Sequence, residues 1–176
     1  MNHIILERRF DPTLLPEDFR QMALEASGCM PLYQVKWHES LLALDGSRLL
    51  CRFEAPDAES VRQISRDPRT RSKIAWTGTL HDTGREGSAN VVVARSFDEP
   101  TTVEALQAIE DASAWCLEQR QVTFLRTFFS ADCRRMMCLY SAPDAESVRE
   151  AQREARMPVE GVWACQHYTP ASFAPD

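Results

Sequence analysis

The chain has 176 residues, of which 44% are hydrophobic and 26% are charged. A chain of this length can bury a core of useful size in one or two domains. Its 20 basic and 26 acidic residues give a net charge of −6 at pH 7. This balance argues against general binding to nucleic acid or to an anionic membrane, because there is no basic surplus to neutralise phosphates.

From the sequence we expect neither a membrane span nor a secretion signal. No apolar run approaches the roughly 18 residues needed to cross a bilayer, and the N-terminus turns charged at Glu7 and Arg8. We therefore expect a soluble, cytoplasmic protein with no membrane and no nucleic-acid partner. In that compartment the six cysteines should be thiols rather than disulfides.

The second half of the chain repeats the first. Residues 55–62, APDAESVR, recur letter for letter at 142–149, an offset of 87 residues. The same offset, without a gap, pairs further identical residues: Arg8 with Arg95, Phe10 with Phe97, Asp11 with Asp98, Cys29 with Cys116, Cys51 with Cys138, and Trp76 with Trp163. A constant offset over nearly a whole half-chain indicates a tandem duplication.

Each half follows the order β-α-β-β-α-β. In the first half, β-branched and apolar segments predict strands at 4–10, 34–42, 48–54 and 75–80. Apolar residues at helical spacing predict a helix over 16–30. Asp45-Gly46 predicts a hairpin turn, because both residues tolerate positive φ. Pro56 is expected to open a second helix as its first residue.

The second half gives the same elements. Strands are expected at 91–97, 121–129, 135–141 and 162–168, with one helix over 103–116 and another opening at Pro143. Asp132-Cys133 occupies the equivalent hairpin turn. A glycine-containing linker separates the halves.

This order of elements is that of the ferredoxin-like unit. We predict an α+β protein with two tandem ferredoxin-like repeats, residues 1–83 and 90–170, a linker at 84–89 and a tail at 171–176. Such a sheet carries helices on one face only, so its open face needs cover. We expect the repeats to pack sheet to sheet as an intramolecular pseudo-dimer of the dimeric α+β-barrel type.

Three segments resemble a known family. They are Glu7-Arg8-Arg9-Phe10 in the first strand, an aromatic residue shortly before the APDAESVR segment, and Arg156-Met157-Pro158-Val159 before the last strand. Together they are similar to the small nickel-binding, ferredoxin-like domain-of-unknown-function family, in two tandem copies. The resemblance implies cytoplasmic dimers of ferredoxin-like subunits and metal binding in at least one member.

A candidate metal site lies on the last strand. Cys165 and His167 fall on one face at period two, and their donors suit nickel, zinc or copper. A third ligand has to come from elsewhere, with Cys133 or Cys138 as candidates. The alternative is a small apolar cysteine beside a histidine at a strand end.

A candidate ligand pocket lies on the first repeat. Its polar residues alternate on two neighbouring strands, where they would face the other sheet: Lys36, His38, Ser40, Arg52 and Glu54. The equivalent wall of the second repeat is more apolar: Thr123, Leu125, Thr127, Leu139 and Ser141. One polar wall against one apolar wall favours a ligand cavity. The alternative is an internally satisfied polar seam.

Other reactive residue types have simpler interpretations. Most cysteines fall at apolar positions and are expected in the core: Cys29, Cys51, Cys116 and Cys138. Cys133 lies in a turn beside two arginines and is expected to be an exposed thiol. Arg8 and Arg95 are expected to form structural salt bridges. The basic run Arg66, Arg69, Arg71 and Lys73 is expected to be a solvated face.

Three functions are compatible with these patterns. The leading one is a non-catalytic binding protein for nickel, another transition metal or a small ligand held between the repeats. The second is a cofactor-free oxygenase or isomerase using His38, and the third is a protein-interaction scaffold. The partners would be a small ligand or metal ion, and the protein a monomeric pseudo-dimer or a homodimer of it. No phosphate-binding loop, dinucleotide motif, nucleophile elbow or Cys-x-x-Cys pair occurs.

Overall fold

The structure, a computed structural model, describes residues 1–173. These residues form two compact units. Unit 1 contains residues 1–78 together with 166–173, and unit 2 contains residues 79–165. Both units combine an antiparallel sheet with helices, so the predicted α+β class and the β-α-β-β-α-β order are confirmed.

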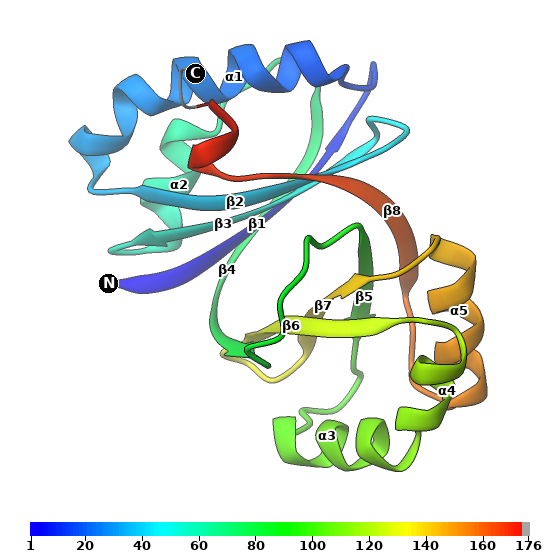
Figure 1. The fold of residues 1–176 in the computed structure, drawn as a ribbon. Coiled ribbons are helices and arrows are strands. Elements are labelled where there is room, and N and C mark those ends of the chain that lie inside the picture. Colours follow the sequence, from blue (N-terminus) through cyan, green and yellow to red (C-terminus); the bar gives the residue numbers. More distant parts are fainter. Residues whose placement is uncertain (174–176) are drawn as a thin grey trace. The chain divides into compact units, whose positions relative to one another are not determined.

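Unit 1 is built from four strands, two α-helices and two short 3-10 helices. In chain order its elements are β1 (Asn2–Phe10), α1 (Pro16–Cys29), η1 (Met30–Tyr33), β2 (Lys36–Ala43), β3 (Arg48–Ala55), α2 (Ala58–Ile64), β4 (Thr70–Asp82) and, at the end of the chain, η2 (Pro170–Phe173). Strand β1 pairs antiparallel with both β3 and β4, and β3 also pairs with β2. Helices α1 and α2 lie on the same side of this sheet (Figure 1).

The core of unit 1 lies between the sheet and these helices. Phe19 and Met22 of α1 and Val61 of α2 pack there against alternate residues of the strands, among them Leu49 and Cys51. Because strand side chains point alternately to opposite faces, the residues between those core positions face away from the helices. Arg52 and Glu54 of β3 lie on that second face.

The end of the chain completes this core. Tyr168, at the end of β8, is buried, and its ring centroid lies 4.7 Å from that of Phe19. The ring centroids of Phe173, in η2, and Trp37 are 5.5 Å apart. Figure 1 shows η2 beside α1 within unit 1. Aromatic pairs at these separations stabilise a core beyond the area that they bury.

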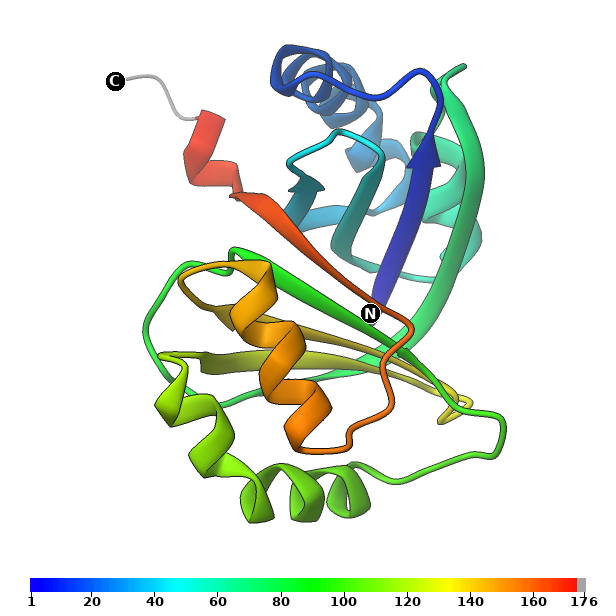
Figure 2. The same cartoon turned by 90° about the vertical axis from the view of Figure 1, so that its right-hand side faces the viewer.

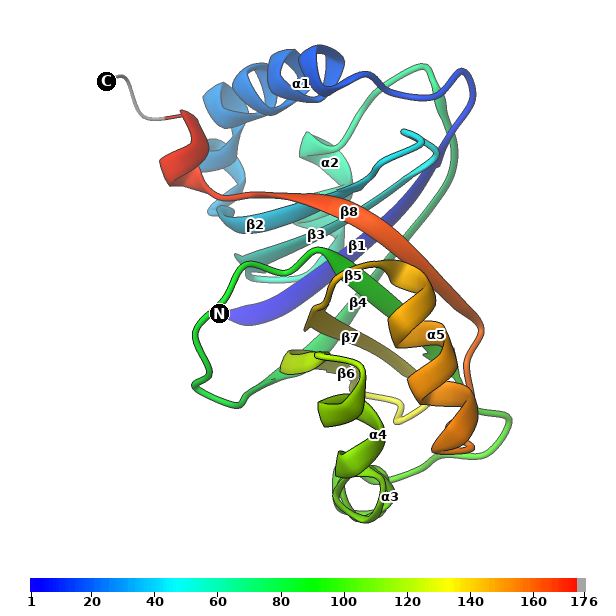
Figure 3. The same cartoon turned by 45° about the vertical axis from the view of Figure 1, so that its right-hand side comes forward.

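Unit 2 has the same order of elements. They are β5 (Val91–Ser96), α3 (Val103–Ala112), α4 (Ala114–Gln119), β6 (Thr123–Ser130), β7 (Arg135–Ser141), α5 (Ala145–Glu154) and β8 (Gly161–Tyr168). Strand β5 pairs antiparallel with β7 and β8, and β7 pairs with β6. The helices lie on one side of the sheet (Figures 2 and 3). Leu106, Val148 and Tyr140 contribute to the core between them.

The units share local irregularities at the offset of 87 residues. The β2–β3 register shifts between Trp37 and Glu39, and the β6–β7 register shifts between Phe124 and Arg126. Gln34 and Gln121 both have positive φ. In the hairpin turns, Gly46 and Cys133 have φ of 70° and 59°.

The unit boundaries differ from the expected halves. Residues 79–83 belong to unit 2, where the Thr83 amide donates to the Leu125 carbonyl, and residues 166–173 belong to unit 1. The reason is that β4 and β8 each run past the end of one unit into the other. Within the expected linker, residues 84–89 form neither helix nor strand. In the expected tail, 171–173 belong to η2, and 174–176 lie outside the described residues.

Two helix predictions also need correction. The helix expected over 103–116 is divided into α3 and α4 at Ser113, whose φ of −116° departs from helical geometry. Neither proline opens the second helix of its unit. Asp57 and Asp144 are the N-caps, and each side chain accepts a hydrogen bond from the backbone amide of the serine three residues on.

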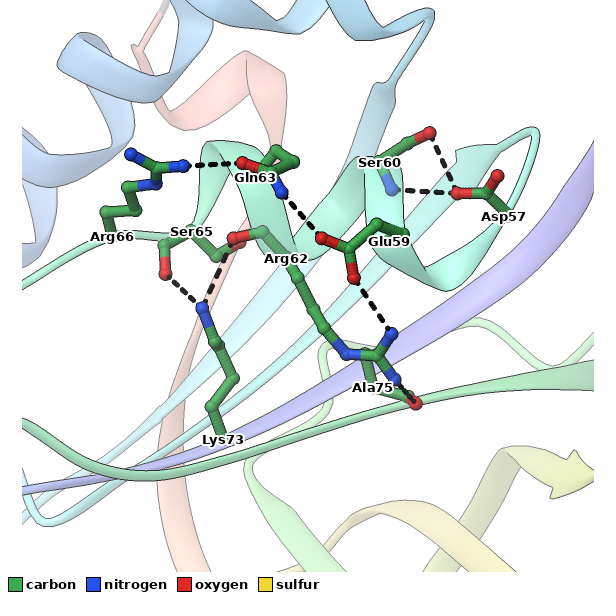
Figure 4. A network of polar contacts seen from close by, with 9 residues as sticks. All are labelled: Asp57, Glu59, Ser60, Arg62, Gln63, Ser65, Arg66, Lys73 and Ala75. Atoms are coloured by element: carbon green, nitrogen blue, oxygen red, sulfur yellow. Dashed lines mark hydrogen bonds and ion pairs between the residues drawn. The ribbon is translucent and has the colours of Figure 1, made fainter.

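Polar contacts cap the N-terminus of α2 and anchor its C-terminal part to β4 (Figure 4). Asp57 caps its N-terminus, and Arg62 donates to the Ala75 carbonyl of β4. Lys73 of β4 donates to the carbonyls of Arg62 and Ser65 at the C-terminal end of the helix. The expected solvated basic run is therefore partly structural, because Arg69 also binds Asp67 with two hydrogen bonds.

None of the helices in the described chain is long and apolar enough to cross a membrane.

Candidate functional site

A bulge in β2 determines which polar side chains meet in unit 1. Trp37 lies opposite Phe53, but the next paired residue is Glu39, opposite Arg52, so His38 is an extra residue in the ladder. Glu39 therefore projects on the same side as Arg52. The Arg52 Nε donates to Glu39 Oε1 at 2.8 Å.

The Glu39 carboxylate also contacts a residue from the far end of the chain. His167 of β8 places its Nε2 3.0 Å from Glu39 Oε2. The Glu39 side chain is only 4% exposed. A carboxylate so deeply buried is stable as an anion only with partners of this kind.

A second carboxylate–histidine pair lies alongside. The His38 Nε2 is 3.3 Å from Glu54 Oε2, and this contact holds the pKa of Glu54 below its usual value. His3 of β1 lies directly across from Glu54. Burial, followed by the neighbouring Arg52 cation, lowers the pKa of His3, so its neutral form is favoured at pH 7. We call the following six residues the polar cluster: His3, His38, Glu39, Arg52, Glu54 and His167.

The polar cluster differs from the predicted pocket in its membership. His38, Arg52 and Glu54 lie in it as expected on one side of the sheet, and Lys36 is an exposed residue opposite Glu54. Ser40 is a correction, because the bulge at His38 turns its hydroxyl to the helix side. There it accepts from the Trp37 indole Nε1 at 2.9 Å and donates to Cys51 Sγ at 2.9 Å.

Sequence reasoning did not find the other three members of the polar cluster. A strict period-two alternation put Glu39 on the wrong face, and His167 was assigned only to a metal site. The position of His3 opposite Glu54 follows from the β1–β3 register, which the sequence does not state. Three of the chain's four histidines lie in the polar cluster, and the composition does not show that they come together.

The predicted metal ligands are not brought together. Across residues 1–173, no group of three or more histidine, cysteine, aspartate or glutamate side chains has the geometry of a metal site. Cys165 is buried near the Ala89 carbonyl, and burial raises the pKa of its thiol to about 12, which disfavours the thiolate that a metal would need. His167 binds Glu39 instead, and Cys133 lies in the β6–β7 turn with its Sγ near the Ala131 carbonyl.

The other thiols are placed mostly as expected. Cys51, Cys116 and Cys138 are buried, whereas Cys29 is exposed at the end of α1, contrary to the prediction. Cys133 is partly exposed. None of the six forms a disulfide.

A small cavity lies on the helix side of the unit 1 sheet. Its volume is about 30 Å³, and its walls are mainly apolar side chains of α1, β2 and β3, including Phe19, Met22 and Trp37. Its polar groups are Arg8, Ser40, Cys51 and Ser65. A cavity of this volume exceeds the roughly 10–15 Å³ that one water molecule requires.

Arg8 is the unusual residue of this cavity. It is only 6% exposed, yet its Nη1 contacts a sulfur, Met22 Sδ at 3.4 Å, and its Nε has no hydrogen-bond partner. The salt bridge expected for Arg8 is not formed with any carboxylate in the described chain. Asp67 is committed to Arg69. Burial lowers the pKa of Arg8, which the neighbouring Cys51 only partly opposes.

The equivalent arginine of unit 2 is well satisfied. Arg95 is 1% exposed, and it donates to the Pro158 carbonyl at 2.8 Å, to Gln152 Oε1 at 2.6 Å and to the Tyr140 hydroxyl at 3.3 Å. Tyr140 in turn donates to Glu110 at 3.4 Å, so the predicted carboxylate acts through a tyrosine. Burial opposes the charged form of Arg95, but Cys138, Tyr140 and Glu110 together raise its pKa above the usual value.

Comparison with solved structures finds proteins that are similar over nearly the whole chain. A crystal structure of a candidate chlorite dismutase is similar with a TM-score of 0.53 and 10% identity, covering 96% of each chain. A heme-binding protein from Thermus thermophilus has a TM-score of 0.49 and 8% identity, over 97% of this chain and 93% of that one. A candidate monooxygenase from Lactobacillus acidophilus has a TM-score of 0.45 and 8% identity, over 95% and 94%. The similarity to the candidate chlorite dismutase, at 10% identity, shows that the two proteins share a fold and nothing about activity.

One segment of the chain matches a family model. Residues 92–164, within unit 2, match the family described as nickel responsive protein SCO4226-like. The predicted relationship to a nickel-binding family is thus supported for the second half of the chain. None of the chain's histidines lies in the matched segment. No curated protein matches the sequence significantly.

Proposed function

We propose that the protein is a non-catalytic binding protein for a small polar ligand, which contacts the polar cluster of unit 1. The observation that carries this proposal is the nearly buried Glu39 carboxylate, which Arg52 and His167 both contact beside a second pair, His38 and Glu54. Hydrogen-bond donors and acceptors held at fixed positions in partly buried surroundings are what orient a small ligand.

The fold itself does not require these polar groups. At the equivalent positions unit 2 has a different set: Leu80, Asn90, Leu125, Arg126, Leu139 and Ser141. Both units nevertheless have the same order of strands and the same register shift. This asymmetry supports a role in binding for the cluster rather than a role in folding. The shared geometry and the constant offset also support our proposal that the units are copies of one ancestral unit.

A metal ion is the ligand that the nickel-responsive family match supports. The side chains present do not fit a preformed metal site, because no suitable group of three exists among residues 1–173 and the Arg52 cation lies beside Glu39. A cation at this position would repel an approaching metal ion. We therefore assign the polar cluster to an organic ligand with both donor and acceptor groups.

Side-chain NMR of protein labelled with ¹⁵N-histidine tests this proposal. A panel of small amides, polyols and hydroxy acids is titrated, and the ring signals are assigned with His3→Leu, His38→Leu and His167→Leu variants. We expect at least one compound to shift the signals of His38 and His167 saturably, while those of His81 stay unchanged. A panel without any saturable shift would contradict the proposal.

Nickel is tested in the same sample. Because Ni²⁺ is paramagnetic in octahedral sites, it broadens the signals of any histidine that it binds. We expect no selective broadening at His3, His38 and His167. Selective broadening there at stoichiometric nickel would replace the organic ligand with a metal ion.

The second candidate is a cofactor-free oxygenase or isomerase. The 3.3 Å contact between His38 and Glu54 favours it, because a carboxylate that orients a histidine is a common arrangement for a general base. Such an enzyme would exchange an acidic C–H of its substrate with deuterium from D₂O. Exchange that is lost in His38→Leu and kept in His81→Leu would favour the enzyme over the binding protein.

A further inference from the structure

The cavity of unit 1 occupies the positions from which unit 2 satisfies its buried arginine. Tyr140 and Gln152 accept hydrogen bonds from the Arg95 guanidinium, and Glu110 accepts one from Tyr140. Their counterparts at the offset of 87 residues are Ala23, Phe53 and Ser65, and all three line the cavity beside Arg8. Unit 1 has kept the buried cation and replaced the long polar partners with shorter or apolar side chains.

A buried guanidinium without oxygen acceptors is energetically unfavourable. Transfer of a charged group out of water costs several kcal/mol unless an opposite charge or hydrogen bonds compensate for it. The Nε atoms of both arginines lack a partner, so the difference lies at the terminal nitrogens. Arg95 donates from these atoms to three oxygens, whereas Arg8 has two sulfur contacts, Met22 Sδ and the Cys51 thiol, and the face of the Phe10 ring.

We propose that the cavity binds a small monoanion, specifically a short-chain carboxylate, with the Arg8 guanidinium as its counter-ion. A guanidinium is planar and matches the two oxygens of a carboxylate. The cavity volume of about 30 Å³ limits the ligand to a few heavy atoms, as in formate or acetate. The apolar walls formed by Phe19 and Met22 suit the short hydrocarbon end of such an acid. This site lies on the opposite side of the sheet from the polar cluster, and the proposal does not depend on the function assigned above.

The Cys51 thiol is the alternative counter-ion. It accepts a hydrogen bond from Ser40 at 2.9 Å and lies beside Arg8. Burial raises the pKa of Cys51 in spite of these two neighbours, so the neutral thiol is favoured at pH 7. Cys138 has the same relation to Arg95 in unit 2, where other acceptors are present. Because both arginines have such a thiol, Cys51 does not make up for the oxygen acceptors that Arg95 has and Arg8 lacks.

The Trp37 indole gives a readout at the site. It lines the cavity, and its Nε1 donates to Ser40. The chain has four tryptophans, so indole N–H signals of the full-length protein provide three internal references. Sodium acetate is titrated at constant ionic strength, with acetamide as the uncharged probe of similar shape. We expect acetate, and not acetamide, to shift the Trp37 signal saturably.

Two kinds of variant locate the anion. Arg8→Met should abolish the shift, and the triple variant Ala23→Glu, Phe53→Tyr, Ser65→Gln should weaken acetate binding at least tenfold, because it rebuilds the internal partners of unit 2. Ala23→Glu alone serves if the triple variant does not fold. The matched control is Gln107→Ala on α3, which should bind acetate as the native protein does.

Three results would overturn the proposal. An equal shift with acetamide would mean that charge is not recognised. A linear shift of all four indole signals would show a general salt effect. A thiolate absorbance near 240 nm at pH 7 that disappears in Cys51→Ala would make Cys51 the counter-ion.

Discussion

Buried arginines are tolerated according to the acceptors around them, and the two in this protein differ in that respect. We expect Arg8→Met to leave the free energy of unfolding unchanged or to raise it, because it removes a buried charge that lacks oxygen partners. Arg95→Met should lower it by about 3 kcal/mol or more, because Pro158, Gln152 and Tyr140 would lose their common donor.

Urea unfolding of both variants without added carboxylate measures this difference. Phe10→Leu, a change beside the Arg8 guanidinium that keeps the charge, is the control for repacking. Equal destabilisation by Arg8→Met and Arg95→Met would show that Arg8 has compensation comparable to that of its counterpart.

Single residues also show how much of the candidate site the sequence can reveal. The sequence alone shows that the two units differ at three positions that matter for these arginines. The offset of 87 residues aligns Ala23 with Glu110, Phe53 with Tyr140 and Ser65 with Gln152. The alignment alone does not show that these six positions converge on two arginines. That convergence needs the strand register and the placement of the helices, which are tertiary properties.

At the scale of elements, the two hairpin turns are a natural matched pair. Gly46 and Cys133 both have positive φ, and their carbonyls accept from the amides of Leu14 and Thr101. A side chain at Gly46 would bring its Cβ to 2.1 Å from the Leu14 carbonyl oxygen. The β6–β7 turn, by contrast, has a side chain in the conformation that favours glycine.

We therefore expect opposite effects from exchanging the two residues. Gly46→Cys should destabilise the protein by about 2 kcal/mol or more, and Cys133→Gly should stabilise it by about 1 kcal/mol. Thermal and urea unfolding measure both effects, with Cys133→Ser as the control for loss of the thiol. Stabilisation by Gly46→Cys would contradict this account of the turn.

The N-caps of α2 and α5 make stability depend on pH. Hydrogen bonds from the Ser60 and Ser147 amides hold the pKa values of Asp57 and Asp144 below the ordinary value of 3.8. Groups with depressed pKa values contribute stability above that value, and the contribution is lost as the pH falls through the lower, folded-state pKa. Unfolding midpoints should therefore fall below about pH 4.

The double variant Asp57→Asn, Asp144→Asn isolates this contribution. Asparagine keeps a side-chain oxygen that can cap the helix but does not titrate. We expect its urea midpoint to fall less between pH 5 and pH 3 than that of the native protein. Identical pH profiles would assign the acid sensitivity to other carboxylates.

Elements were more predictable than their registers. Hydrophobic periodicity and turn residues located every strand and the first helix of each unit, because those signals are local. The bulge at His38 has no local signal, and it moved Ser40 and Glu39 to opposite faces from those that strict alternation predicts. The break at Ser113 was missed for the same reason, since the apolar spacing continues across it.

On the scale of the whole molecule, neither expected half is complete by itself. Residues 1–83 lack Tyr168 and Phe173, which complete the aromatic core around Phe19. Loss of a buried aromatic side chain costs about 3–5 kcal/mol. We expect a 1–83 fragment to be largely unfolded by circular dichroism, and a 79–165 fragment to retain native-like structure.

Addition of a peptide spanning 161–173 is the control for this prediction. It should increase the structure of the 1–83 fragment and move its tryptophan emission towards that of a buried indole. A 1–83 fragment that is fully folded without the peptide would show that the end of the chain is dispensable for unit 1.

The membership of the two units has a consequence for the order in which the chain folds during synthesis. Unit 2 is continuous from residue 79 to residue 165, so its last strand residue leaves the ribosome before Tyr168 does. Unit 1 begins before unit 2 in the chain but needs Tyr168, which follows unit 2, to close its aromatic core. Unit 2 can therefore close first, while Phe19 and Trp37 of unit 1 stay uncovered until Tyr168 and Phe173 have been synthesised.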